Sequence, residues 1–319
     1  MILILSNEND LSTCEVLEWI TYFGCKYIRL NETDNVYFKK LKIENKQTSI
    51  LVENQDNDIN LSDFSSYWYR RGSFNLSNFK WELPIQNDLI NHLYKERFFL
   101  LDYIYSTLDS IHGLGCFNTS TSSKLKSLHC ASICELIIPQ TNIVVNKKQV
   151  EQIFLEGNSL ITKCIQDMPQ FKVDGKLCFL YTEELDNLKI SELSDEFAPS
   201  IVQNKIDKKY ELRIFYINKK CYSMAIFSQN DEKTAIDFRK YNLSRPNRSI
   251  PYKLPKEIEI KIIKFMKYMN LDTGSIDMIY TPNKEYVFLE VNPIGQFGMV
   301  STPCNYLLEK KIARYLVNY

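Results

Sequence analysis

The sequence predicts a mixed α/β and α+β fold built in three parts. Its 319 residues are enough for about two or three domains with a large core, and 45% of them are hydrophobic. Over residues 1–117, short apolar runs typical of strands alternate with stretches of helical periodicity, which indicates a small α/β domain. Residues 118–200 and 201–319 combine helices with strands and a final hairpin, and we expect them to form a central and a C-terminal part.

Composition excludes several classes of function. The chain carries 39 basic and 39 acidic residues, so it lacks the basic field of a nucleic-acid-binding protein, and its apolar stretches are too short to span a bilayer. Its nine cysteines form no CxxC pair, which favours reduced cysteines in a cytoplasmic protein without a zinc site. Neither GxGxxG nor GxxxxGK[ST] occurs, which excludes the usual Rossmann and P-loop sites. We therefore expect neither a nucleic-acid nor a membrane partner.

The first part begins with a strand at residues 1–6 and a helix after it. A capping box at Ser12-Thr13-Cys14-Glu15 is expected to start this helix, and Gly24 is expected to end it. The stretch 31–47, rich in Asn and Lys, is expected to be a variable loop with some helix. The other elements expected here are strands at 27–30, 48–52 and 67–69, and a long helix at 84–108.

The second and third parts are expected to contain more strands than helices. A connector at 166–176, with Pro169, Asp174 and Gly175, resembles a mobile loop. In the second part we expect a helix at 120–136 and strands at 159–165 and 177–181. In the third part we expect strands at 201–206, 210–217 and 222–227, a helix at 255–270, and a hairpin of 275–280 with 286–292.

The final hairpin carries a candidate metal site. Asp277 lies on its first strand, and Glu290 and Asn292 lie on one face of its second, because side chains alternate with period two. A two-residue turn at Asn283-Lys284 would place Asp277 opposite Glu290, with Cβ atoms about 5 Å apart. Two carboxylates and an amide oxygen are hard ligands that suit Mg²⁺ carrying nucleotide phosphates. The alternative is a polar sheet face with solvated acids.

Several motifs together resemble one enzyme family. Gly274-Ser275-Ile276-Asp277 and Leu289-Glu290-Val291-Asn292-Pro293 resemble the metal-binding end of the ATP-grasp fold. Ile294-Gly295-Gln296-Phe297-Gly298, Trp68-Tyr69-Arg70-Arg71-Gly72 and Asp237-Phe238-Arg239 narrow the resemblance to the graspetide synthetases, peptide-maturing ligases of the microviridin type, with the grasp-with-spasm maturases as a candidate subgroup. The resemblance covers essentially the whole chain. It implies an N-terminal pre-ATP-grasp domain (1–117), a central ATP-grasp domain (118–200) and a C-terminal ATP-grasp domain with the Mg²⁺ site (201–319).

The same resemblance implies residues that bind the phosphates of ATP. Lys124 and Lys163 are similar to the two lysines that contact phosphate, and Lys163 lies within an apolar strand, where a charge needs a partner. Arg213 would act in catalysis on the transferred phosphoryl group. Solvated surface charges are the alternative for the two lysines.

The adenosine half of ATP is assigned to a hinge between the two ATP-grasp domains. Gln203-Asn204-Lys205-Ile206-Asp207 resembles this hinge. Backbone groups from Asn204 to Ile206 would read adenine, and Asp207 would bind the ribose hydroxyls. An ordinary strand that ends in a basic turn is the alternative.

Two further pairs are candidates for binding the substrate. Asp237 and Arg239 are two residues apart, so an extended backbone would present both on one face. Arg239 suits bidentate capture of a peptide carboxylate, and Asp237 would either orient it or deprotonate an acceptor hydroxyl. Arg70 and Arg71 would bind an acidic core peptide, with a structural salt bridge as the alternative for each; a structural pair is likewise the alternative for Asp237 and Arg239.

The resemblance implies an ADP-forming ligase that uses ATP and Mg²⁺. Such an enzyme phosphorylates Asp or Glu side chains of a ribosomal precursor peptide and joins them to Thr or Ser hydroxyls or Lys amines, as ω-ester or ω-amide rings. The leader of the precursor and a second copy in a homodimer are the expected partners. Two alternatives remain open at this point: another ATP-grasp carboxylate–amine ligase that adds amino acids to a peptide or protein, and a non-catalytic peptide-binding relative.

Overall fold

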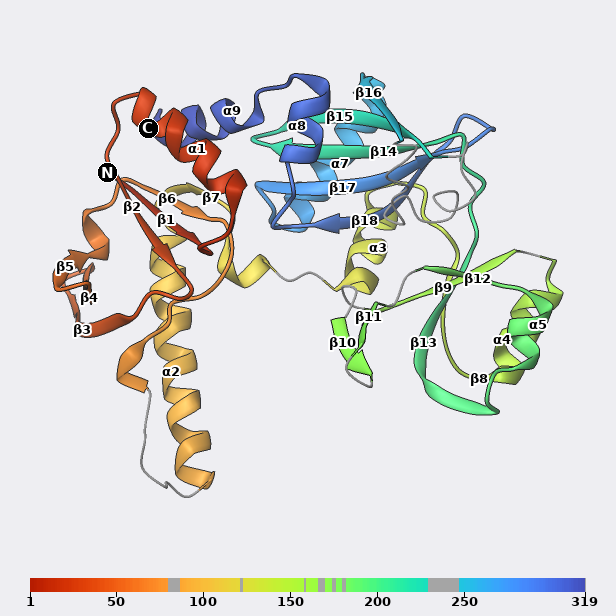
Figure 1. The fold of residues 1–319 in the computed structure, drawn as a ribbon, viewed down its shortest axis with the longest axis horizontal. Coiled ribbons are helices and arrows are strands. Elements are labelled where there is room, and N and C mark those ends of the chain that lie inside the picture. The colour runs from red at the N-terminus through yellow and green to blue at the C-terminus, as the bar shows by residue number, and fades with distance from the viewer. Residues whose placement is uncertain are drawn as a thin grey trace. The chain divides into compact units, whose positions relative to one another are not determined.

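The computed structural model describes the chain except for residues 80–86, 121–122, 158, 166–169, 174–175, 180–181, 229–246 and 319. The chain divides into two compact units (Figure 1). The first unit contains residues 1–121, 271–273 and 296–319, and the second contains residues 122–270 and 274–295. The second unit contains more than one sheet. The expected division of the chain into three domains remains a prediction.

A parallel sheet forms the centre of the first unit. Strand β1 (Ile2–Ser6) is buried along its whole length, as expected for a continuous apolar run inside a parallel sheet. It pairs with β2 (Tyr27–Asn31) on one side and β6 (Ser66–Tyr69) on the other, and β6 pairs with β7 (His112–Leu114). The strands expected at the start of the chain are therefore confirmed.

Two helices distant in sequence pack together in the first unit. Helix α1 (Leu11–Tyr22) lies against α9 (Leu308–Val317) (Figure 1). The Lys310 ammonium lies 4.5 Å from the centre of the Trp19 ring, a distance suited to a cation–π contact. The C-terminal end of the chain therefore completes the first unit.

The stretch 31–47 forms a strand where we expected a loop with some helix, so that expectation is wrong. Strand β3 (Val36–Glu44) pairs antiparallel with β4 (Gln47–Asn54), which pairs with β5 (Asn57–Asn60). The turn between β3 and β4 consists of Asn45 and Lys46, with φ of 49° and 68°. Two residues of positive φ make the tight turn that matches the twist of a hairpin, and this turn allows the polar stretch to form paired strands.

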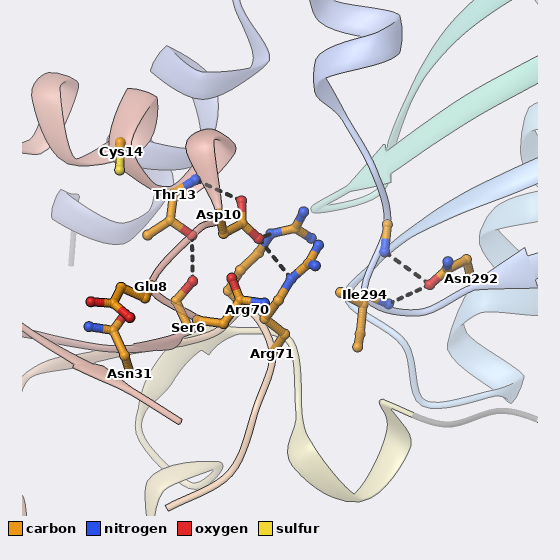
Figure 2. Close-up of polar contacts among 12 residues, drawn as sticks. Ser6, Glu8, Asp10, Thr13, Cys14, Asn31, Arg70, Arg71, Asn292 and Ile294 are labelled. Carbon is orange, nitrogen blue, oxygen red and sulfur yellow. Dashed lines mark hydrogen bonds and ion pairs between the residues drawn. The ribbon is translucent and has the colours of Figure 1, made fainter. Parts of the chain in front are cut away.

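Helix α1 begins at a different residue from the one expected. Its N-cap is Asp10, whose carboxylate accepts a hydrogen bond from Thr13 N at 3.1 Å, so the expected capping box at 12–15 is wrong. Asp10 Oδ2 also lies 3.1 Å from Arg70 Nε and 2.7 Å from Arg71 Nε (Figure 2). Gly24, with φ of +72°, follows the helix end, as expected.

The remaining helices of the first unit include a long one, α2 (Asn87–Leu108), which confirms the expected helix over these residues; residues 84–86 lie outside the described chain. Tyr105 of α2 stacks on Phe117 with ring centres 3.8 Å apart, and its hydroxyl accepts a hydrogen bond from Phe74 N. These two contacts of Tyr105 fix α2 to the core of the unit. Helix α8 (Gly298–Cys304) precedes α9.

The smaller sheet of the second unit has the order β12-β9-β13-β8. Helices α4 (Lys147–Leu155) and α5 (Asn187–Ser191) pack together beside it (Figure 1). Its antiparallel strands are β8 (Thr141–Asn146), β9 (Leu160–Lys163), β12 (Glu183–Leu185) and β13 (Glu196–Asn204).

A short hairpin overlaps the expected connector. Strand β10 (Gln170–Val173) pairs antiparallel with β11 (Lys176–Phe179). The expectation of a loop over 166–176 is therefore wrong for residues 170–173 and 176, and residues 166–169 and 174–175 lie outside the described chain.

The larger sheet of the second unit has the order β16-β15-β14-β17-β18. Phe265 of α7 (Lys256–Tyr268) packs on Phe288 with ring centres 4.9 Å apart, and α3 (Lys124–Ile133) packs against both α7 and β18. Over the part of the chain that the structure describes, no helix is long and apolar enough to cross a membrane. The strands are β14 (Tyr210–Ile217), β15 (Lys220–Phe227), β16 (Arg248–Tyr252), β17 (Thr273–Tyr280) and β18 (Tyr286–Asn292).

The buried pair of Asp10 and Arg70 gives a testable prediction for the first unit. Burial lowers the pKa of the Arg70 guanidinium to about 10, and the Asp10 charge partly offsets this effect. Asp10→Asn keeps an oxygen for the helix cap but leaves Arg70 buried beside a neutral amide, so we expect the free energy of unfolding to fall by about 3 kcal/mol. The measurement is urea unfolding followed by tryptophan fluorescence, because all three tryptophans lie within residues 19–81. Glu44→Gln, in the exposed pair with Lys42, is the control and should change nothing measurable; an Asp10→Asn variant as stable as wild type would contradict the prediction.

Candidate active site

Asp277 and Glu290 lie directly opposite each other on the β17–β18 hairpin, which confirms the expected pairing. The expected turn is wrong, however. Thr281 and Glu285 close a three-residue loop, and near it Met278 lies opposite Phe288. Leu289 is then an extra residue, a β-bulge, and beyond it the register shifts by one. The bulge brings the two acids onto one face of the sheet.

Each of these acids is paired with a basic side chain. Arg213 Nη1, on β14, donates to both carboxylate oxygens of Asp277. Lys124 Nζ, at the first residue of α3, lies 3.6 Å from Glu290 Oε2. The four side chains are between 11% and 27% exposed, so water screens these charges less than it would at the surface. Four of the predicted site residues therefore meet on one face.

Asn292, the third predicted metal ligand, is on the same face, but its side-chain oxygen accepts hydrogen bonds from the backbone just after it. Its Oδ1 accepts hydrogen bonds from Ile294 N at 3.1 Å and Gly295 N at 3.3 Å (Figure 2). Gly295 has φ of +48°, and a Cβ there would lie 3.0 Å from Gly274 C, so this turn requires glycine. The amide oxygen would have to leave or share these bonds to bind a cation.

A second ion pair supports the strand that carries Arg213. Glu211 is two residues before Arg213 on β14, so both side chains lie on the same face. Its carboxylate accepts from Lys208 Nζ and, at 2.9 Å, from Ser228 Oγ. Burial raises the pKa of Glu211, Lys208 opposes this effect, and the nearby charge of Asp277 adds to it. Opposite charges thus alternate across this face.

The predicted hinge is the connection between the smaller and larger sheets. The side chain of Gln203 is buried in the smaller sheet, where its Nε2 donates to Thr141 Oγ1 at 2.7 Å. Asn204 is the last residue of β13, and its N–H donates to Gln140 O at 3.1 Å. Ile206 is half-buried and Asp207 is exposed, and both lie between β13 and β14. Lys163 is at the end of β9, paired with Ile201 of β13, so it lies on the same sheet as the hinge.

The remaining predicted residues are not brought to this face by the described contacts. Arg70 and Arg71 belong to the first unit, where both contact Asp10. Arg70 is 3% exposed, which favours the structural salt bridge over peptide binding, whereas Arg71 is 30% exposed. Asp237 and Arg239 lie outside the described residues.

The sequence motifs assign no role to Lys208, Glu211 or the Lys205–Glu184 ion pair, whose charged atoms are 2.7 Å apart. A signal for Glu211 was present, because it and Arg213 are polar residues at alternate positions of an otherwise apolar strand. Lys208 and Glu184 have no such signal, since their partners are set by the fold. No group of three or more His, Cys, Asp or Glu able to hold a metal occurs among the described residues, so the candidate site has two carboxylates and an amide.

The Lys208–Glu211 pair gives a prediction about how the free energy of unfolding depends on pH. Lys208→Met leaves Glu211 buried beside an apolar group and should lower the free energy of unfolding by about 3 kcal/mol. Because the pKa of Glu211 is then raised further, the folded state binds more protons than the unfolded state, so the loss should be larger at pH 8 than at pH 5. Adding Glu211→Gln should recover part of the loss and remove the pH dependence. Urea unfolding at both pH values measures this; equal losses at both would contradict it.

Comparison with known proteins places this geometry in a family. A RimK-like ATP-grasp domain matches residues 121–316. No match is found among curated proteins. The RiPP-associated ATP-grasp ligase of Chryseobacterium gregarium, solved with ADP and a leader and core peptide, is 26% identical, with 99% of this chain and 96% of that chain covered and a TM-score of 0.83.

Two macrocyclases from Microcystis aeruginosa are also similar in structure. MdnC, solved with precursor peptide MdnA, is 26% identical, with 100% of both chains covered and a TM-score of 0.79. MdnB is 22% identical, with 99% of this chain and 98% of that chain covered and a TM-score of 0.72, and shares the fold. The expected ATP-grasp fold is confirmed. Because the matched domain spans more than half of the sequence, the chain belongs to the RimK-like ATP-grasp family.

Proposed function

We propose that this chain is an ADP-forming ligase that closes rings in a ribosomally made precursor peptide. Each ring would join an Asp or Glu side chain of the peptide to a Thr or Ser hydroxyl, or to a Lys amine, as an ω-ester or ω-amide. The observation that carries the proposal is that Asp277 and Glu290 share one sheet face with Arg213 and Lys124. Similarity along the whole chain to two ligases solved with precursor peptides supports a peptide as the substrate.

Asp277, Glu290 and Asn292 are the residues that would hold Mg²⁺. Their oxygens are the hard ligands that this ion prefers, and two partly buried acids placed face to face would be relieved of repulsion by a divalent cation. When bound, Mg²⁺ would neutralise charge on the nucleotide phosphates.

ATP would lie between the cations of this face and the hinge. Lys124, Lys163 and Arg213 supply positive charge for a polyphosphate, with Arg213 suited to two parallel bonds. The N–H of Ile206 has no hydrogen-bond partner among the described residues, which leaves it able to bind adenine. The exposed carboxylate of Asp207 would accept from the ribose hydroxyls.

The mechanism follows from what these residues can do. A peptide carboxylate attacks the γ-phosphate of ATP, and ADP leaves. The hydroxyl or amine of the same peptide then attacks the acyl carbon of the resulting acyl phosphate, and phosphate leaves. Arg213 would stabilise the charge on the transferred phosphoryl group, and peptide binding would hold the two reacting side chains together.

Asp237 and Arg239 are the residues proposed to bind the reacting side chains of the peptide. Arg239 would bind the peptide carboxylate, and Asp237 would orient that arginine or accept the proton of the acceptor hydroxyl. Arg71 keeps part of its surface exposed and is the better candidate of the two neighbouring arginines for an acidic core peptide.

The reaction itself is the test of this proposal. With ATP, Mg²⁺ and its cognate precursor, the protein should yield ADP and a peptide lighter by one water per ring, as measured by mass spectrometry. Glu290→Gln and Asp277→Asn should each lose more than about 100-fold in rate, because a ligand charge is removed. Glu285→Gln, on the exposed loop of the same hairpin, is the matched control and should keep wild-type activity.

Other outcomes would contradict the proposal. A heavier peptide would indicate a ligase that adds amino acids, and an unchanged peptide would indicate a binding protein. Formation of AMP and pyrophosphate would contradict attack at the γ-phosphate. Near-normal rates in both Glu290→Gln and Asp277→Asn would mean that the hairpin is not the metal site.

Arg239→Ala should separate substrate binding from nucleotide binding. Because the proposed partner of Arg239 is the peptide carboxylate, the variant should bind ATP as wild type does while losing ring formation by about 100-fold. Calorimetric titration with a non-hydrolysable ATP analogue and the cyclisation rate measure the two effects. Weakened nucleotide binding with cyclisation restored at high ATP would place Arg239 in the nucleotide pocket.

A further inference from the structure

Helix α2 of the first unit packs on the core through one of its faces. The side chains of this inner face follow the i, i+3, i+4, i+7 spacing of a single helix side, and they are Leu101, Ile104, Tyr105 and Leu108. Three of them are at most 1% exposed, and Leu101 packs against the same core. The inner face is therefore covered by side chains of the chain itself.

A second face of α2 is exposed and carries two phenylalanines between charges of opposite sign. It has the same spacing, and its residues are Lys95, Phe98, Phe99 and Asp102. Phe98 is 62% exposed and Phe99 is 65% exposed, and their ring centres are 5.5 Å apart. Lys95 and Asp102 are exposed, and among the described residues neither has an ion-pair partner. Asp102 accepts a long hydrogen bond, 3.5 Å, from Asn118 Nδ2.

The exposed face offers enough apolar surface for a protein partner. An aromatic side chain buries about 150–250 Å² when it is fully covered, so at their exposures the four phenylalanine rings of two helices would bury about 500 Å². This is about half of the 1,000 Å² that a specific interface needs. Tyr94, which is 54% exposed one turn before Phe98, adds to it. The helix spans 22 residues, and Figure 1 shows its N-terminal part extending beyond the strands of the first unit.

We propose that this face of α2 binds the same face of a second copy of the chain, with the two helices antiparallel. In a two-fold dimer a surface is its own partner, so the surface must be complementary to itself. With the symmetry axis between the two phenylalanines, Phe98 of one copy faces Phe99 of the other. Lys95 of each copy then faces Asp102 of the other, and both contacts occur twice.

The placement of the charges is what indicates a second copy rather than another partner. Lys95 lies three residues before Phe98, and Asp102 lies three residues after Phe99. Opposite charges at equal distances from the aromatic centre satisfy each other only when the face meets its own antiparallel copy. The inference does not depend on the proposed function, because it uses no residue of the candidate active site.

Charge reversal tests this arrangement directly. Lys95→Glu places two acids opposite each other, and Asp102→Lys places two lysines opposite each other, so each variant alone should dimerise about tenfold more weakly than wild type. Mixed in equal amounts, the two variants should dimerise like wild type, because every pair in the mixed dimer again joins opposite charges. Glu96→Lys changes an exposed charge on the same helix outside this face, and as the matched control it should have no effect.

The measurement is sedimentation velocity of the full chain over a range of protein concentrations, at low ionic strength, where charges are screened least. The mass of wild type should rise toward twice that of one chain. Replacing both Phe98 and Phe99 by Ala should weaken dimerisation more than about 100-fold, because the apolar centre is lost. Tyr22→Ala removes a 75% exposed ring from α1 of the same unit and should leave dimerisation unchanged. Circular dichroism checks that each variant is folded.

Each of three results would overturn the proposal. Wild type that stays monomeric at every concentration has no such interface, and if the double alanine variant then loses binding of the cognate precursor, the peptide is the occupant of this face. A dimer that is unaffected by the loss of both phenylalanines uses another surface. If Lys95→Glu and Asp102→Lys each weaken the dimer but do not restore it when mixed, the two helices do not pair antiparallel through these residues.

Discussion

The position of Asp277 opposite Glu290 is the constraint on which the rest of this site depends. It is produced by one extra residue, Leu289, because side chains alternate along a strand and a shift of one residue moves a whole set to the other face. Without the bulge, Asp277 would lie opposite Leu289, and Glu290 would point to the other side of the sheet. A single irregularity in one strand therefore creates a face with two acids.

Two acids on one face are unfavourable by themselves, and the neighbouring elements supply the charges that offset them. Arg213 comes from β14 and Lys124 from the first residue of α3, so the pair is served by two separate elements. Glu211 and Lys208 extend the alternation of charge toward the hinge. The same arrangement that makes the folded protein tolerate these acids also provides the cations that a polyphosphate needs. The same basic side chains would therefore serve both the stability of the fold and the proposed function.

The sequence predicted the elements that carry the site better than the contacts within it. Apolar runs are enough to predict the final hairpin. The pairing of its acids is predicted from a two-residue turn, and it holds only because a three-residue loop and an extra residue, Leu289, together give the same register at Asp277. The prediction of a loop over residues 31–47 is wrong, because turn residues with positive φ such as Asn45 and Lys46 are polar like those of a loop. The ion pairs of Asp10 with Arg70 and Arg71, and the pair of Glu290 with Lys124, join residues far apart in sequence. Such contacts are set by packing, which local patterns do not encode.

Transfer of oxygen from the peptide to phosphate tests the central claim, carboxylate activation by ATP, most directly. A precursor labelled with oxygen-18 in its Asp and Glu side chains is cyclised in unlabelled water, and the released phosphate is examined by mass spectrometry. An acyl phosphate keeps one carboxylate oxygen on phosphorus when the ring closes, so the account predicts one labelled oxygen in the phosphate for each ring formed. Unlabelled phosphate accompanying ring formation would contradict it.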